Sequence, residues 1–69
     1  MRYAELVREL RRLGVEFYRQ GKGSHEVWWD PATGRRAMIP NHPGQEIKKK
    51  TLAAILRDLR LTEDDLTGI

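Results

Sequence analysis

The chain has 69 residues, with thirteen lysine and arginine residues against ten acidic residues, two histidines and no cysteine. This length allows one domain with a small core, expected to span residues 1–69, and the lack of cysteine excludes disulfide bridges and thiolate metal ligands. No apolar run is long enough to cross a membrane and no secretory signal opens the chain, so we expect a cytoplasmic protein.

The positive charge is concentrated before the last nine residues. Those nine contain Glu63, Asp64 and Asp65 but no base. A basic body suits a polyanionic partner such as nucleic acid, but the same excess can simply keep a small protein in solution. Composition alone does not decide between these two interpretations.

Residues 2–13 are predicted to form an amphipathic helix. Gly14 follows as a stop signal, and apolar side chains recur at helical spacing, namely Tyr3, Leu6, Val7, Leu10 and Leu13. The arginines of the outer face are partly matched by Glu5 and Glu9 at neighbouring helical positions, as in an ordinary solvated helix.

Three strands are predicted next. Residues 15–20 are rich in β-branched and aromatic types, and a turn containing Gly21 and Gly23 follows. The stretch 24–30, "SHEVWWD", then completes a β-hairpin. A second turn leads into a strand over residues 35–40, which ends at a proline. We therefore expect an antiparallel three-stranded meander.

A second helix is predicted over residues 47–60, where apolar residues again have helical spacing, namely Leu52, Ile55, Leu56 and Leu59. Thr62 and Asp65 then form a capping-box pattern, and Leu61 and Leu66 lie where a hydrophobic staple would join. These features predict a final short helical turn.

Each helix has one apolar stripe, and both stripes can be buried against one face of the sheet. The predicted fold is therefore α+β, a two-layer α-β-β-β-α sandwich whose other sheet face is open. Strand alternation sends Trp28 and Trp29 to opposite faces, one into the core and one to the open face or an edge. An exposed tryptophan can stack on a base or anchor a protein partner.

Lysines stand at two positions that suit phosphate. Lys48, Lys49 and Lys50 lie at the predicted start of the second helix, where unpaired N–H groups already carry partial positive charge. Since this placement disfavours the helix, we favour a phosphate site over a solvated face. Lys22 lies in the Gly21–Ser24 turn, whose glycines let the backbone approach a ligand, but the spacing of a P-loop is absent.

His25 is the sharpest candidate for chemistry. It shares a strand face with Val27 and Trp29, so it is either a structural histidine at the end of a core face or a functional residue. The neighbouring Ser24 points to the opposite face and cannot use His25 as its base. No metal-ligand spacing is present, and we expect neither metal nor cofactor. Beside phosphate-binding cations, a histidine can take the 2′-hydroxyl proton of RNA and start attack on the neighbouring phosphorus.

Three motifs resemble the HicA toxins of bacterial HicA/HicB toxin–antitoxin pairs: Gly23-Ser24-His25 before the second strand, "IPNH" after the third, and the closing stretch "EIKKKTLAAILRDLRLTEDDL". The resemblance covers nearly the whole chain. It implies a fold like the double-stranded RNA-binding domain, an endoribonuclease that cleaves mRNA with His25 as catalytic residue, and a HicB-type antitoxin that blocks the active site. It also implies that Lys22, Gly23, Ser24 and the three lysines of the second helix contact RNA.

The chain departs from the family pattern at Lys50, where many members have glycine before the threonine that opens the last helix. His42 matches a "Pro-x-His" pattern and is a secondary site candidate, for which a structural or partner-contacting role is favoured over that of general acid. Three functions stay open: a metal-independent ribonuclease toxin, a noncatalytic RNA-binding module, and a protein-interaction domain. The resemblance favours the first.

Overall fold

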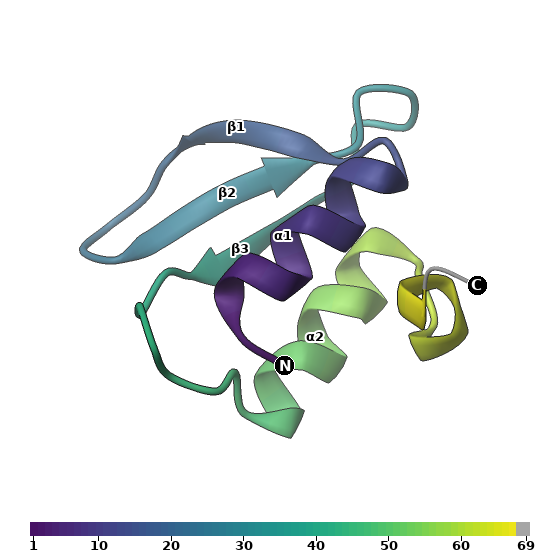
Figure 1. Cartoon of the computed structure of the whole chain (residues 1–69). Helices are drawn as coiled ribbons and strands as arrows, with labels where there is room; N and C mark the ends of the chain where they lie inside the picture. The colour runs from purple at the N-terminus through teal and green to yellow at the C-terminus, as the bar shows by residue number, and fades with distance from the viewer. Residues whose placement is uncertain (68–69) are drawn as a thin grey trace.

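The computed structural model describes residues 1–67, so that residues 68 and 69 of the predicted domain lie outside the described residues. It confirms the α-β-β-β-α order (Figure 1). The elements in chain order are helix α1 (Tyr3–Arg12), strands β1 (Glu16–Gln20), β2 (His25–Trp29) and β3 (Arg36–Pro40), helix α2 (Lys49–Leu59) and the 3₁₀ turn η1 (Glu63–Thr67).

Helix α2 begins two residues later than predicted because the chain before it is held in an extended bridge. The backbone N–H of Ile47 donates to the carbonyl of Met1 at 2.9 Å, and Arg2 pairs with Glu46. Lys48 keeps an extended backbone conformation as the N-cap residue. The segment before α2 is therefore fastened to the segment before α1.

The sheet has the order β1-β2-β3, with both neighbouring pairs antiparallel. His25 pairs with Pro40 at one end of β2, and Trp29 pairs with Arg36 at the other. The pairing of β1 with β2 shifts by one residue at Tyr18, which is the signature of a β-bulge. The meander predicted from the turn residues is confirmed.

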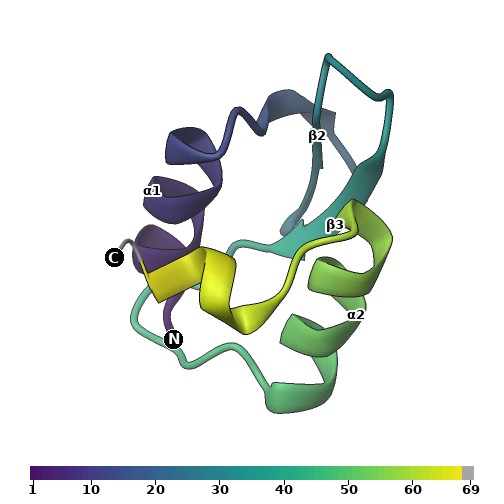
Figure 2. The ribbon, with the colours of Figure 1, turned by 90° about the vertical axis from the view of Figure 1, so that its right-hand side faces the viewer.

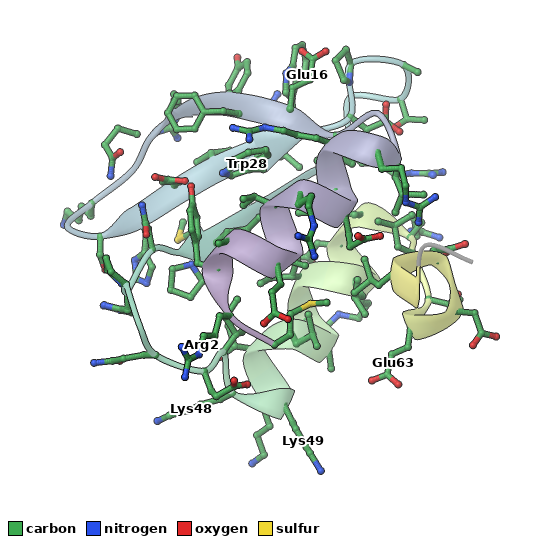
Figure 3. All side chains as sticks on the ribbon, viewed as in Figure 1. Arg2, Glu16, Trp28, Lys48, Lys49 and Glu63 are labelled. Atoms are coloured by element: carbon green, nitrogen blue, oxygen red, sulfur yellow. The ribbon has the colours of Figure 1, made fainter. Side chains whose placement is uncertain are left out.

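Both helices cover one face of the sheet, as predicted (Figures 1 and 2). Trp28 is only 1% exposed and lies among the apolar side chains of α1 and α2. Figure 3 shows it on the helix-facing side of the sheet, with Glu16 pointing away. Trp29 lies half-buried on the opposite, open face, where its ring centroid is 4.6 Å from that of Tyr18. The predicted division of the two tryptophans is confirmed.

The two helices end in the same way. At the end of α1 the N–H of Val15 donates to the carbonyl of Leu10 at 2.9 Å, and Gly14 has φ +89°. At the end of α2 the N–H of Leu61 donates to the carbonyl of Leu56 at 2.8 Å, and Arg60 has φ +59°. Both are Schellman-type ends, and α2 therefore places an arginine where α1 has glycine.

The turn predicted after α2 is present as η1. The N–H of Thr62 donates to the Asp65 carboxylate at 2.8 Å, which is half of the predicted capping box. Leu66 is buried in the core, and Leu61 packs against it. These contacts pack η1 onto the helix layer.

Candidate functional site

A cleft of about 410 Å³ lies where β2 and β3 meet the loop before α2. It contains both histidines of the chain and one of the predicted phosphate-binding lysines. Its lining residues are His25, Met38, Pro40, His42, Gln45, Glu46, Ile47, Lys48 and Thr51. The cleft is the candidate active site because it brings a titratable pair and a cation together.

His25 enters the cleft from the first position of β2. Its backbone is fully engaged in the hairpin: its N–H donates to the carbonyl of Lys22 at 3.0 Å, and its carbonyl accepts the N–H of Gly21 at 2.8 Å and the Gln20 side-chain amide at 2.9 Å. The residue is exposed, on the sheet face away from the helices. Trp28, on the opposite face of β2, belongs to the hydrophobic core cluster, whereas Val27, on the face of His25, is buried outside that cluster. His25 therefore lies at an exposed end of the open sheet face and not at the end of a core face.

His42 comes from the loop that follows β3, and it is exposed. Its Nε2 atom is 3.2 Å from the hydroxyl oxygen of Ser24, within hydrogen-bonding distance. Strand alternation predicted that Ser24 could not use His25 as its base. It did not predict that the loop after β3 would bring His42 within hydrogen-bonding distance of Ser24. This contact joins residues 18 positions apart and has no local signal.

A buried carboxylate holds the loop of His42 in place. Glu26 is 9% exposed and accepts hydrogen bonds from Tyr3 Oη at 2.6 Å, Trp28 Nε1 at 2.9 Å and Asn41 Nδ2 at 3.0 Å. The backbone N–H of Asn41 also donates to the carbonyl of Ser24 at 2.9 Å. Two hydrogen bonds from Asn41 therefore fasten the start of the loop to Glu26 of β2 and to Ser24, the residue before β2.

The charge of Glu26 is stabilised by these donors. Burial by itself raises the pKa of Glu26, but the hydrogen bonds from Tyr3, Trp28 and Asn41, with the nearby charge of Arg11, hold the pKa below its ordinary value. Burial and the bond to Glu26 raise the pKa of Tyr3 to about 12. The pair is therefore an ionised glutamate and a neutral tyrosine at neutral pH.

Glu26 and Asn41 were not among the residues predicted from the sequence. The available signal was alternation, since Glu26 must share the face of Trp28 if that tryptophan is in the core. The signal was ambiguous because Val27, Trp28 and Trp29 are all apolar, so either face of β2 could have been the buried one.

The predicted phosphate-binding residues divide into two groups. Lys48 lines the cleft, whereas Lys22, Lys49 and Lys50 do not. Lys49 and Lys50 are exposed in the first turn of α2, whose N-cap makes no side-chain capping bond. Figure 3 shows Lys48 and Lys49 at the end of the molecule formed by the start of α2.

The hairpin tip presents the other group. Lys22 is exposed, and Gly23 has φ +57°, a backbone conformation that favours glycine. Gln20 closes the tip by donating its side-chain amide to the carbonyl of Gly23 at 3.1 Å. Lys22 and Gly23 directly precede Ser24 in the chain. The Ser24 hydroxyl contacts His42, which lines the cleft, so the hairpin tip adjoins the cleft.

Glu46 is the acidic residue of the cleft lining. The N-terminal ammonium donates to its carboxylate, and Arg2 lies 3.6 Å from its other oxygen. The hydrogen bond from the terminus, the charge of the terminus and Arg2 together hold the pKa of Glu46 below its ordinary value. Glu46 is therefore an ionised, partnered group at neutral pH.

Within residues 1–67, no group of three or more histidine and acidic side chains is arranged to hold a metal ion. Over the same residues, no helix is both long and apolar enough to span a bilayer.

The fold and the cleft together define a small α+β protein with two histidines beside a cationic helix start. The model of the HicA toxin family of bacterial toxin–antitoxin systems matches residues 3–61, and the chain belongs to this family. The family is known as mRNA interferases, and its members have an antitoxin partner. No curated protein sequence matches the chain.

Proposed function

We propose that the protein is the toxin of a type II toxin–antitoxin pair and cleaves mRNA without metal or cofactor, with His25 as general base. The observation that carries this proposal is the exposed His25 ring in a cleft that also contains Lys48. The hairpin bonds hold the backbone of His25 from both sides, so the ring is presented from a rigid support.

In the proposed reaction, His25 takes the proton of a 2′-hydroxyl, and the resulting oxygen attacks the adjacent phosphorus. Lys48 stabilises the negative charge that develops on the phosphate oxygens. The products are a 2′,3′-cyclic phosphate and a free 5′-hydroxyl. Every step uses proton transfer and electrostatics, which the cleft residues supply.

Two cationic elements are proposed to hold the RNA on either side of this reaction. One is the hairpin tip with Lys22, Gly23 and Ser24, and the other is the start of α2 with Lys48 to Lys50. Backbone phosphates are the natural ligands of both, since lysine binds phosphate as a point charge and a helix start presents free N–H groups. Recognition by backbone and shape is also the rule for A-form RNA.

The antitoxin is proposed to be a HicB-type protein that covers the cleft. An acidic partner would complement the basic body of the toxin and compete with RNA for the same lysines. We place the reaction in the cytoplasm, where mRNA and a co-expressed antitoxin meet.

The test uses the purified protein and a long mRNA in excess chelator. Wild type is expected to cleave the RNA, and His25→Ala to leave it intact while still shifting it on a native gel. Arg57→Ala, an exposed substitution at the other end of α2 and outside the cleft lining, is the matched control and is expected to cleave. Cleavage by His25→Ala would place the active site elsewhere. Binding without cleavage by wild type would favour the alternative function, a noncatalytic RNA-binding module.

A further inference from the structure

We propose that His42 is the general acid that protonates the leaving 5′-oxygen, and that Ser24 is the residue that positions its ring. This inference rests on the proposed ribonuclease function and adds a second catalytic residue to it. It departs from the structural or partner-contacting role that the sequence favoured for His42.

The geometry places two imidazoles on one cleft from different elements. His25 comes from the start of β2, and His42 comes from the loop after β3. Attack by a 2′-oxygen and departure of a 5′-oxygen occur in line, so base and acid must reach the phosphorus from different directions. Two histidines on separate elements can meet this requirement, whereas one histidine serving both oxygens cannot do so in a single step.

The other polar groups of the cleft are poor proton donors to an alkoxide. Lys48 is an ammonium, which acts on phosphate as a fixed point charge. Glu46 is ionised and already bound to the N-terminal ammonium, with Arg2 beside it. Gln45 and Thr51 have no acidic proton near neutral pH. Histidine is the side chain that most often transfers protons in general acid–base catalysis, so His42 remains.

The ring of His42 is oriented by its surroundings. Its Nε2 atom lies 3.2 Å from Ser24 Oγ, which leaves Nδ1 as the nitrogen available to a substrate. Asn41, the preceding residue, donates its side-chain amide to Glu26 of β2 and its backbone N–H to the carbonyl of Ser24, just before β2. These bonds fix the loop at the residue immediately before His42. A catalytic residue on a loop needs such support to hold a defined position.

In the proposed reaction each proton and each bond is accounted for. The 2′-hydroxyl proton passes to His25, the 2′-oxygen forms a bond to phosphorus, and the bond from phosphorus to the 5′-oxygen breaks. Protonated His42 gives its Nδ1 proton to that oxygen while its Nε2–H donates to Ser24 Oγ. His25 ends protonated and His42 neutral, and exchange with water restores both.

The experiment compares two RNA substrates that differ at one atom. The first contains a cleavage site mapped with wild type, and the second carries sulfur in place of the leaving 5′-oxygen at that site. A thiolate leaves without protonation, so the sulfur substrate does not need a general acid. His42→Ala is expected to slow the oxygen substrate by about 100-fold or more, the usual contribution of a general acid, and to cleave the sulfur substrate about as fast as wild type.

Two further variants separate the roles. His25→Ala is expected to fail on both substrates, since the attacking oxygen still needs its base. Ser24→Ala, compared on both substrates at saturating RNA so that weaker binding by the hairpin tip does not contribute, is expected to slow the oxygen substrate about 10-fold more than the sulfur substrate, because a misplaced acid matters only where a proton is needed. His42 is exposed, so the thermal unfolding midpoint of His42→Ala should equal that of wild type.

Several results would overturn the inference. Equal losses of His42→Ala on both substrates would make His42 a binding residue, and rescue of His25→Ala by sulfur would reverse the two roles. Equal losses on both substrates in Ser24→Ala at saturating RNA would overturn its positioning role toward His42. Wild type that cleaves neither substrate would refute the proposed function itself, and the inference would fall with it.

Discussion

Glu26 connects the core of this protein to its candidate active site. One of its carboxylate oxygens accepts hydrogen bonds from Tyr3 and Trp28, which belong to the helix-facing layer. The other accepts the side chain of Asn41, which begins the loop of His42. A buried ionised group is tolerated only when such partners are complete, and this carboxylate has three.

Glu26→Gln is expected to lower the free energy of unfolding by about 2 kcal/mol at pH 7. Glutamine has one acceptor oxygen, and its NH₂ group must face donors from Tyr3, Trp28 or Asn41. The loss is measured by urea unfolding of the two proteins. Glu16→Gln is the matched control on the exposed strand β1, with an expected change of less than about 0.5 kcal/mol.

The same pair of proteins has a predicted pH dependence. The pKa of Glu26 is lower in the folded protein than its ordinary value of 4.5, so its charge stabilises the folded state above pH 4.5. This contribution is lost as the pH falls through the lower folded value. The stability difference between wild type and Glu26→Gln should therefore narrow below pH 4.5, and a constant difference would contradict the assignment.

At the scale of elements, the start of α2 carries positive charge at a position where it lowers the stability of the helix. Its first turn contains Lys49 and Lys50 and no acidic residue, and its N-cap, Lys48, makes no side-chain capping bond. Three cations beside the positive end of a helix dipole repel it. A phosphate placed there would reverse the sign of this interaction.

Replacing Lys48, Lys49 and Lys50 together by alanine should weaken RNA binding and make it less dependent on salt. The slope of log K against log salt is expected to fall by about 2, since each lost phosphate contact removes about 0.7 to 0.9. The measurement is a titration of RNA at several salt concentrations, with Arg57→Ala at the far end of α2 as control. An unchanged slope would make the lysines an ordinary solvated face.

The same triple substitution should stabilise the folded protein. Removing cations from a helix start is worth about 0.3 to 1 kcal/mol at low ionic strength, and the gain should shrink in high salt. If the triple variant binds RNA more weakly and is also more stable, the lysines contribute to RNA binding at a cost in helix stability. A variant whose helix was merely disrupted would lose both RNA binding and stability.

The two helix ends offer a matched test of backbone strain. Gly14→Ala should cost about 1 kcal/mol, because alanine at φ +89° is strained although a Cβ there has no atom within 4 Å. Arg60→Gly should instead raise stability by about 0.5 kcal/mol, because glycine adopts φ +59° without strain. Urea midpoints of the two variants, displaced in opposite directions, are the expected result.

At the scale of the molecule, a small core depends heavily on one side chain. Trp28 belongs to the core cluster that also contains the apolar side chains of both helices. Its ring lies edge-on to that of Phe17, with the centroids 6.0 Å apart, and the Arg11 guanidinium lies 5.2 Å from its centroid. A chain of this length buries little surface, so its total stability is marginal. The loss of one large core side chain is comparable to that total.

Trp28→Ala is expected to cost about 3 to 5 kcal/mol and to leave the protein largely unfolded at room temperature. Trp29→Ala removes the same side chain from the open face, where it packs on Tyr18, and should cost about 1 to 2 kcal/mol with the fold kept. Circular dichroism with thermal unfolding distinguishes them. Similar losses in both variants would mean that the open face contributes as much stability as the core.

The element order could be predicted because its signals are local. Helical spacing of leucines, glycine at Gly14, and turn residues between apolar runs each depend on a few neighbouring positions. The same signals predicted that one tryptophan is buried and the other faces outward, and they placed lysines at a helix start. They could not say which face of β2 is buried, because Val27, Trp28 and Trp29 satisfy either choice.

By itself, the sequence determined the α-β-β-β-α order, the cationic helix start and the resemblance to HicA toxins. The tertiary structure alone decided that His25 is exposed, that Ser24 meets His42, and that Glu26 fastens the loop through Asn41. These contacts join residues about 15 positions or more apart and form only when β3 pairs with β2 and its following loop folds back. Contacts of this kind depend on strand register and loop closure, which no local pattern of residue types encodes.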